Sequence, residues 1–392
     1  MSLLPPLRLT RARVLRDGEM QDRSVAIADG RITKGPLPEV DLSGYLILPG
    51  IVDLHSDALE RHLLPRPPAA FPAAAALAAA EREAAAAGVT TVWLAQGWSW
   101  EGGIRAPEAA ERVLQAHQDH RAQAVVDLRV QLRCETHLVD GAPRLLAAVR
   151  RYGIDYVTFN DHVAEVIDAG REAPARVAAR AERLGVAAEE YLAAAGAARV
   201  RAAEVPRHLC RLAEAFDRMG VVYASHDDPD GETRERFAMI GAKLAEFPAT
   251  RRAAATARAM GDPVILGAPN VLRGRSHSGR VSALDLLRDR LCDALASDYH
   301  PPSLAAAAWK LVDSGRMGLP QAWTLLSRNP ARVLRLPDRG EIATGRRADL
   351  VIVNERTRAI EATIAGGRLA YLAGEAGRRF LSAPAAFRLA AE

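Results

Sequence analysis

The sequence predicts a closed (β/α)₈ barrel of the TIM type, joined to a small β-sandwich domain that both ends of the chain build. Eight strand-like apolar runs in the middle of the chain are separated by stretches mostly long enough for a helix, which is typical of parallel strands with helical crossovers. Short alternating segments occur at both ends instead. The 392 residues are sufficient for one large domain with an appendage.

The two ends of the chain carry matching hairpin signals. Within residues 7–48, "ADGRI" (28–32) places an Asp-Gly turn between two candidate strands. Near the other end, "RADLVIV" (347–353) and "EATIAGGRLAYLAG" (361–374) form short strands around a Gly-Gly turn. We therefore expect residues 1–48 and 336–392 to meet in the β-sandwich domain, with residues 49–335 as the barrel.

The barrel strands are expected to follow one another along the chain. The first lies in the apolar run that begins at Tyr45 and ends near Asp57. The other seven are expected at 88–96, 125–135, 154–161, 219–228, 243–247, 263–270 and 292–298. The Ala-rich segment from Pro72 favours a helix, as does 165–218, which either covers the site or extends the scaffold. An open doubly wound sheet is the alternative, but no GxGxxG or Walker pattern occurs.

Composition narrows the functional class. A hydrophobic fraction of 49% and a charged fraction of 26% are typical of a soluble globular protein. The formal charge of +4 comes from scattered arginines, which suits a small anionic substrate and offers no nucleic-acid motif. Three cysteines without CxxC spacing predict free thiols in a reducing compartment. Without a signal-peptide pattern or a long apolar stretch, we expect a cytoplasmic protein with no membrane partner. A homo-oligomer is left open.

Polar side chains stand at corresponding ends of the predicted strands. They are His55 and Asp57 after the first strand, Glu135 after the third, His162 after the fourth, His226 after the fifth and Asp298 after the eighth. Because the carboxyl ends of parallel barrel strands converge on one mouth, these six potential ligands are expected to meet. Gathered carboxylates repel one another unless cations neutralise them. The pattern therefore predicts a divalent metal, first of all zinc, as one ion or two.

Several motifs follow one another in a distinctive order over residues 45–355. They are "LPGIVDLHSDALE", "LRCE", "NDH", "ASHDD", "AEFPAT", "GAPNVLRGRSHSG", "SDYHPPSL" and "NPARVLRLPDRGEIATGRRADLVIV". This series resembles the amidohydrolase superfamily, and within it the enzymes of bacterial alkylphosphonate breakdown. The resemblance implies a metal-dependent barrel with a β domain from both ends. It also implies cleavage of α-D-ribose 1-methylphosphonate 5-triphosphate to the 5-phosphate and pyrophosphate. Metal roles carry over onto His55, Asp57, Glu135, His226 and Asp298.

The sequence departs from the superfamily pattern at two places. The first motif is HxD, where HxH is usual, and His162 follows a strand that seldom supplies a ligand. Glu246, at the end of the sixth strand, is the competing ligand, and His162 then contacts substrate instead. The residues after "NDH" also differ, so a deacylase or cyclic amidase acting on another small molecule is the alternative function. A non-catalytic metal-binding partner in a phosphonate-processing complex is a further rival.

The predicted catalytic and substrate-binding residues complete this reading. Asp298 is expected to take a proton from the attacking water as general base. The segment "NVLRGRSHSGR" (270–280) is expected to be a loop after the seventh strand, where barrels frequently build phosphate sites. Its expected substrate-binding residues are Asn270, Arg273, Arg275, Ser276, His277 and Arg280. Trp98 and Trp100 either wall the pocket or belong to the core.

Overall fold

An eight-stranded parallel sheet forms the centre of the computed structural model, which describes residues 2–276 and 278–382. Its strands are β8 (Ile51–Ser56), β9 (Val89–Trp98), β10 (Asp127–Glu135), β11 (Tyr156–Asn160), β12 (Val222–His226), β13 (Ala245–Glu246), β14 (Val264–Gly267) and β15 (Ala294–Ala296). Each strand pairs in parallel with the next along the chain. A parallel bridge between Ser56 and Asp298 closes the ring. The predicted barrel is therefore confirmed.

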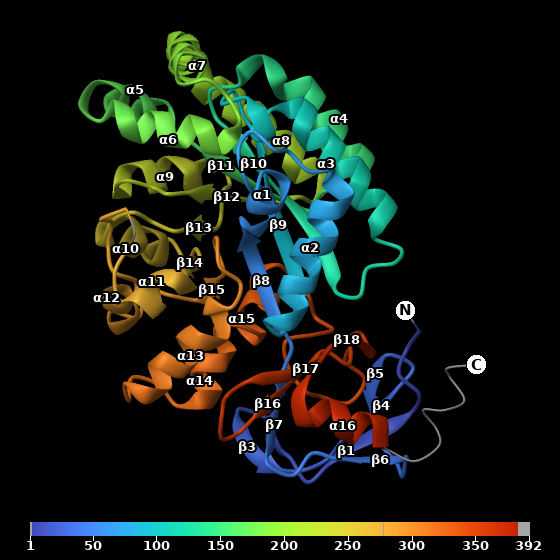
Figure 1. Ribbon diagram of the computed structural model, residues 1–392. Coiled ribbons are helices and arrows are strands. Elements are labelled where there is room, and N and C mark those ends of the chain that lie inside the picture. The colour runs from blue at the N-terminus through green and yellow to red at the C-terminus, as the bar shows by residue number, and fades with distance from the viewer. Residues whose placement is uncertain (1, 277, 383–392) are drawn as a thin grey trace.

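Helices surround the barrel and follow its strands in order (Figure 1). They are α1 (Ala58–Leu63), α2 (Ala73–Ala86), α3 (Pro107–His120), α4 (Ala142–Tyr152), α5 (Val163–Glu172), α6 (Pro174–Leu184), α7 (Ala188–Val200), α8 (Val205–Met219), α9 (Gly231–Met239), α10 (Arg251–Ala259), α11 (Ala268–Arg273), α12 (Ala283–Arg288), α13 (Ser303–Asp313), α14 (Leu319–Thr324), α15 (Arg328–Val333) and α16 (Gly374–Ser382), with short 3₁₀ turns η1 (Gly103–Arg105), η2 (Val139–Gly141) and η3 (Ala202–Glu204). Within these residues no helix is both long and apolar enough to span a membrane.

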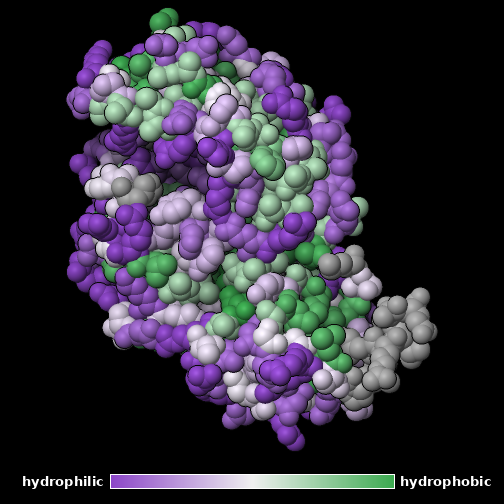
Figure 2. All heavy atoms as spheres, viewed as in Figure 1, coloured by the Kyte–Doolittle hydropathy of each residue, from purple (hydrophilic) through white to green (hydrophobic). Residues whose placement is uncertain are grey.

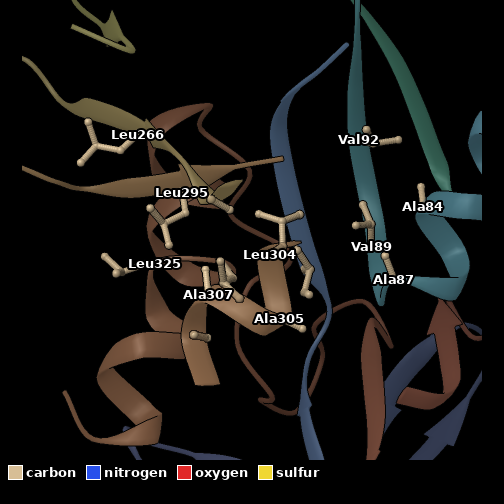
Figure 3. Close-up of a cluster of buried hydrophobic side chains, with 14 of the residues drawn as sticks. Ala84, Ala87, Val89, Val92, Leu266, Leu295, Leu304, Ala305, Ala307 and Leu325 are labelled. Carbon is tan, nitrogen blue, oxygen red and sulfur yellow. The ribbon is translucent and has the colours of Figure 1, made fainter. Parts of the chain in front are cut away.

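The apolar spacing of each helix fixes the face that it buries. In α8, Leu209, Leu212 and Phe216 are buried at helical spacing, while the intervening charged residues stay outside. Small residues allow close approach elsewhere, as in α2, where alanines lie beside Val89 and Val92 of β9 (Figure 3). This packing holds the strands rigid, and so holds the side chains at their ends.

The apolar run from Tyr45 is two strands, which corrects the expectation of one. The first half, β7 (Tyr45–Pro49), belongs to the β domain, and only β8 enters the barrel. Gly50 joins them at a crowded point, because a Cβ there would lie 2.3 Å from Oγ1 of Thr90. Both halves are fully buried, so the hydrophobic pattern shows no boundary between them.

The two ends of the chain build the β-sandwich domain, as predicted. Its remaining strands are β1 (Leu7–Thr10), β2 (Arg13–Arg16), β3 (Glu19–Asp22), β4 (Val25–Ala28), β5 (Arg31–Thr33), β6 (Glu39–Asp41), β16 (Leu350–Asn354), β17 (Ile360–Ala365) and β18 (Arg368–Leu372). One sheet has the order β18-β17-β16-β7-β2-β3 and therefore mixes both ends; the other is β5-β4-β1-β6. Figure 1 shows these blue and red strands side by side below the barrel.

The sheets of the β domain share one core, and both predicted hairpins are present. Leu9 and Ile27 of the smaller sheet lie in the same buried cluster as Ile47 and Ile352 of the larger sheet. The first hairpin joins β4 and β5 through Asp29 and Gly30, whose φ angles are both positive, as a tight turn between antiparallel strands requires. The second joins β17 and β18 through two glycines.

The segment 165–218 is helical, as predicted, and forms most of α5 together with α6, α7 and α8. The first three of these helices share a small apolar cluster that includes Val166, Val177 and Tyr191. Figure 1 shows α5, α6 and α7 at the end of the barrel that lies away from the β domain. The segment therefore stands over the end of the barrel at which the strands finish.

Candidate active site

A cavity of about 1050 Å³ opens where the barrel strands end. Four of the six predicted metal ligands line it, namely Asp57, His162, His226 and Asp298. His55 and Glu135 are buried. Figure 2 shows a recess among hydrophilic side chains on this face of the molecule.

The first group of candidate ligands is organised by Glu246 at the end of β13. Its Oε2 atom lies 3.1 Å from Nδ1 of His55 and 3.0 Å from Nδ1 of His226. Its Oε1 atom accepts hydrogen bonds from Nε2 of Gln131, at 2.7 Å, and from the Tyr156 hydroxyl. Burial opposes ionisation of Glu246, but His55 and His226 outweigh it and lower the pKa of this carboxyl. Glu246 is therefore a carboxylate with four donors around it.

This arrangement decides which imidazole nitrogens face the other ligands. Because an ionised carboxylate only accepts, Nδ1 of both histidines must carry hydrogen. The Nε2 atom of His55 has no hydrogen-bond partner among the described residues and lies 3.4 Å from Oδ1 of Asp57. The Nε2 atom of His226 lies 3.4 Å from Nη2 of Arg133 and accepts from it. The Nε2 atoms of both histidines are thus the atoms available to coordinate a metal ion.

The two histidines differ in charge. Burial disfavours the charged form of His55, but Glu246 and Asp57 outweigh it and raise the pKa of His55 to about 10. Burial lowers the pKa of His226, and Arg133 acts in the same direction. Near neutral pH, these shifts favour the charged form of His55 and the neutral form of His226 in the absence of metal. Since a metal ligand must be deprotonated at the coordinating atom, the Nε2 proton of His55 is the one that a metal ion would displace.

Asp57 and Asp298 stand at the rim of this group. Nη1 of Arg133 lies 2.9 Å from both carboxylate oxygens of Asp57. Burial opposes the charge on Asp57, but Arg133 and His55 hold its pKa well below the usual range. The backbone N–H of Asp298 donates to the carbonyl of His55 at 3.0 Å, and that of Asp57 donates to the carbonyl of Asp298 at 2.6 Å. Burial and the neighbouring Asp57 raise the pKa of Asp298 to about 7.

A second group forms around Glu135 at the end of β10. Its Oε1 atom contacts Nδ1 of His162, and its Oε2 atom accepts from Nε1 of Trp100 at 3.1 Å. Glu101 completes the group, because one ligand atom from each of Glu101, Glu135 and His162 lies within 4.8 Å of the others. The six predicted ligands therefore fall into two groups with two rim carboxylates.

Glu101 is a member of this group that the sequence analysis did not single out. It accepts from the Tyr191 hydroxyl at 2.9 Å, and it pairs with Arg105 and Arg180, each at 3.1 Å. Burial opposes its charge, but Arg105 and its neighbours lower the pKa of Glu101. Its place in "QGWSWEGG", directly after the second strand, is the sequence signal that could have identified it as a residue of the barrel mouth. Of the two tryptophans in this stretch, Trp98 is core and Trp100 contacts Glu135.

The predicted substrate-binding segment is partly helical, which corrects its description as a loop. The helix α11 includes Asn270 and Arg273 and ends at Gly274, whose φ is +80°. Asn270 is held by the backbone, since its side chain donates to the carbonyl of Val281 at 3.1 Å and accepts from the N–H of Ala283 at 3.0 Å.

The remaining residues of that segment have different positions. Arg273, Ser276 and Arg280 line the cavity, as does Asn270, whereas Arg275 is exposed and does not occur among the described lining residues. Arg280 pairs with Asp227. His277 lies outside the residues that the structure describes.

Comparison with known proteins identifies a matching family and a similar enzyme. Residues 73–371 match the model of the amidohydrolase family. The chain is 33% identical over 366 residues to the alpha-D-ribose 1-methylphosphonate 5-triphosphate diphosphatase of Escherichia coli strain K12, a match that covers 89% of this chain and 95% of that protein.

Solved structures with this fold have much lower sequence identity. The beta-aspartyl dipeptidase of Fervidobacterium islandicum AW-1 is 14% identical with a TM-score of 0.62, over 94% of this chain and 97% of that one. The dihydropyrimidinase of Brevibacillus agri NCHU1002 is 13% identical with a TM-score of 0.60, over 95% and 97% respectively. At such identities the likeness concerns the fold alone.

Proposed function

This chain belongs to the amidohydrolase family of metal-dependent hydrolases, and on that premise we propose that it cleaves α-D-ribose 1-methylphosphonate 5-triphosphate to the 5-phosphate and pyrophosphate. The observation that carries the proposal is the likeness to the Escherichia coli diphosphatase along nearly the whole chain. The cavity supports it, because arginines line the same space as Asp57, His226 and Asp298. A polyanionic substrate needs such cations beside the reacting group.

The donor set fits a divalent cation, and we propose zinc. His55 and His226 present Nε2 atoms, and Nε2 of His55 is buried without a hydrogen-bond partner among the described residues. Together with Asp57 and Asp298 they would hold one ion. Glu135 and His162 would hold a second, beside Glu101, whose carboxylate already accepts from Tyr191, Arg105 and Arg180. Mixed imidazole and carboxylate ligands suit zinc and related first-row ions. When bound, such an ion supplies Lewis acidity and lowers the pKa of a coordinated water.

Glu246 is proposed here as an orienting residue, not as a ligand. Its four hydrogen-bond donors already occupy the lone-pair positions of both carboxylate oxygens. A carboxylate that accepts from the far nitrogen of an imidazole ligand fixes its tautomer and ring orientation. Glu246 is in position to do this for two histidines at once, and this supports His162 over Glu246 as the proposed ligand.

Asp298 is the proposed proton acceptor. It lines the cavity, and its backbone is tied to His55 and Asp57, so its carboxyl is held beside the group that would carry the metal. Its φ of +55° lies in the left-handed region, which few residues other than glycine adopt without tertiary constraint. A positioned general base typically contributes about 10²–10⁴-fold to the rate.

The phosphate groups are proposed to contact the segment after β14. Arg273 lines the cavity and forms no ion pair or side-chain hydrogen bond with another described residue, so its guanidinium is available to substrate. Ser276 supplies a hydroxyl on the same wall, and Arg280 is held in place by Asp227. Planar guanidinium groups suit phosphate oxygens, which they bind through two parallel hydrogen bonds.

The test is a pyrophosphate-release assay on the ribose phosphonate triphosphate, combined with metal analysis of the same protein. Wild-type protein containing divalent metal is expected to release pyrophosphate. Asp298→Asn is expected to lose this activity while its metal content stays near that of wild type. Asp285→Asn, on the exposed surface of α12, is the matched control and is expected to remain active.

The alternative reaction gives a different product in the same experiment. Metal-loaded wild-type protein that releases no pyrophosphate but frees an amine from N-acyl or cyclic amide substrates would contradict the proposal. It would then identify a deacylase or cyclic amidase of the same family.

A further inference from the structure

We propose that the cavity has a second anion-binding wall on α6, formed by Arg176, Arg180 and Arg183, which holds an anionic group of the substrate away from the reacting phosphorus. We call these three residues the α6 arginine face. The inference rests on the proposed function to the extent that it assumes a substrate with more than one anionic group. It adds a binding surface from a segment that the sequence alone left without a role.

Helical spacing directs all three arginines to one side of α6. Positions 176, 180 and 183 are separated by four and three residues, so their side chains share a face, and all three line the cavity. The adjacent face of the helix buries Val177, Ala181 and Leu184 in the apolar cluster with α5 and α7. This packing prevents α6 from rotating and keeps the α6 arginine face toward the cavity.

Glu165 of α5 connects this wall with the segment after β14. Its Oε1 atom lies 3.0 Å from Nη2 of Arg176 and 3.7 Å from Nη1 of Arg180. Its Oε2 atom lies 3.7 Å from Nη2 of Arg280. The carboxylate of Glu165 therefore lies between the α6 arginine face and the predicted phosphate-binding segment and is close to both. A single extended anion can reach both walls.

The charge balance of the cavity favours an anionic occupant. Its described lining contains eight arginines and only five carboxylates, the arginines being Arg61, Arg105, Arg133, Arg176, Arg180, Arg183, Arg273 and Arg280. Six of the eight arginines pair with acidic groups. Arg183 and Arg273 form no ion pair or side-chain hydrogen bond with any other described residue. One uncommitted guanidinium thus stands on each wall, and phosphate or phosphonate oxygens are its natural partners.

Two anionic groups of the proposed substrate could bind the α6 arginine face, namely the leaving diphosphate and the phosphonate on the anomeric carbon. The experiment measures binding of inorganic pyrophosphate and, separately, of methylphosphonate to metal-loaded full-length protein by calorimetry. Arg183→Ala is compared with wild type and with Arg199→Ala. Arg199 is a matched control because it is exposed on α7 and does not occur among the described cavity-lining residues. Arg183→Lys reports whether charge alone suffices.

Arg183→Ala is expected to weaken binding of one probe by about tenfold, the effect of losing one charge-assisted hydrogen bond. A loss confined to pyrophosphate places the leaving diphosphate on the α6 arginine face, and a loss confined to methylphosphonate places the phosphonate there. Equal affinities of wild type, Arg183→Ala and Arg199→Ala for both probes would overturn the inference. Thermal melting of Arg183→Ala at the wild-type temperature would exclude a folding effect. We expect this result because Arg183 has no ion pair or side-chain hydrogen bond with another described residue.

The same measurements separate this inference from the proposed function. Binding can be measured without turnover. If the wild-type protein cleaves no triphosphate but binds either probe through Arg183, the α6 anion site is supported and the proposed reaction is contradicted. If the wild-type protein releases pyrophosphate but Arg183→Ala binds both probes with wild-type affinity, the proposed reaction is supported and the α6 site is contradicted.

Discussion

The Oε2 atom of Glu246 lies 3.1 Å from Nδ1 of His55, and both side chains are fully buried. The same oxygen lies 3.0 Å from Nδ1 of His226. One carboxylate at the end of β13 thus sets the tautomer of two imidazoles that come from β8 and β12. We therefore propose that the site depends on Glu246 even though this residue is not itself a metal ligand.

Replacement of Glu246 by Gln is expected to weaken metal binding by about 10–100-fold, the usual effect of removing a residue that orients ligands. A neutral amide cannot accept from four donors, so at least one imidazole loses its fixed orientation. Metal content after dialysis against a series of metal buffers measures the effect. In the metal-free protein, nitrogen NMR is expected to show hydrogen on Nδ1 of His226 in wild type and a mixture of tautomers in Glu246→Gln. A wild-type His226 with hydrogen on Nε2 would contradict this account.

Replacement of Arg105 by Met is expected to destabilise the protein by about 3–5 kcal/mol, because it removes the partner cation of Glu60 and one of the two cations that pair with the buried Glu101. Nε and Nη2 of Arg105 lie 2.6 and 2.8 Å from the oxygens of Glu60, and Nη1 lies 3.1 Å from Glu101. Urea unfolding measures the change. Arg112→Met, at an exposed position of α3, is the control and is expected to change stability by less than about 0.5 kcal/mol. Equal effects of the two substitutions would show that Arg105 has no special electrostatic role.

Replacement of Trp100 by Phe removes one donor from Glu135 and keeps an aromatic ring against Tyr191, whose centroid is 5.9 Å away. The hydrogen bond to an ionised group is worth about 1.5–3 kcal/mol, so a loss of that order is expected in the free energy of unfolding. Chemical denaturation tests it. If Trp100→Phe and wild type unfold at the same urea concentration, the hydrogen bond from Trp100 to Glu135 does not stabilise the fold.

The stability of the protein is expected to fall at acid pH in part through His117. Burial lowers the pKa of His117, whose Nε2–H donates a hydrogen bond to the carbonyl of Leu128 at 2.7 Å. The unfolded chain binds a proton near pH 6.5, whereas the folded chain does so only at a lower pH. The contribution of His117 is therefore present above about pH 6.5 and is lost as the pH falls through the folded pKa.

The measurement compares wild type with His117→Gln by urea unfolding at pH 7.5 and pH 5.5. The difference between the two pH values is expected to be smaller in His117→Gln, which has no titrating ring at this position. Identical pH dependence in both proteins would mean that His117 does not contribute.

The barrel was predictable because its signal is local. Each strand is a short apolar run, and the polar residue that ends it, such as Glu135 or His226, is visible in the sequence at the same place. The split at Gly50 was not visible, because β7 and β8 are both buried and the apolar run continues from one domain into the other. The short helix α11 was missed for a similar reason, since a six-residue helix directly after a strand carries too few periodic residues to be distinguished from a loop.

The sequence by itself determined the chemistry available at the mouth of the barrel: which strands end in imidazole or carboxylate, and that cations stand nearby. Only the tertiary structure decided how these groups are shared. It placed Glu246 between two histidines, added Glu101 to Glu135 and His162, and turned the arginines of α6 toward the cavity. The physical reason is that the kind of donor is a property of one residue, whereas hydrogen-bond geometry, burial and charge balance depend on side chains that lie far apart along the chain.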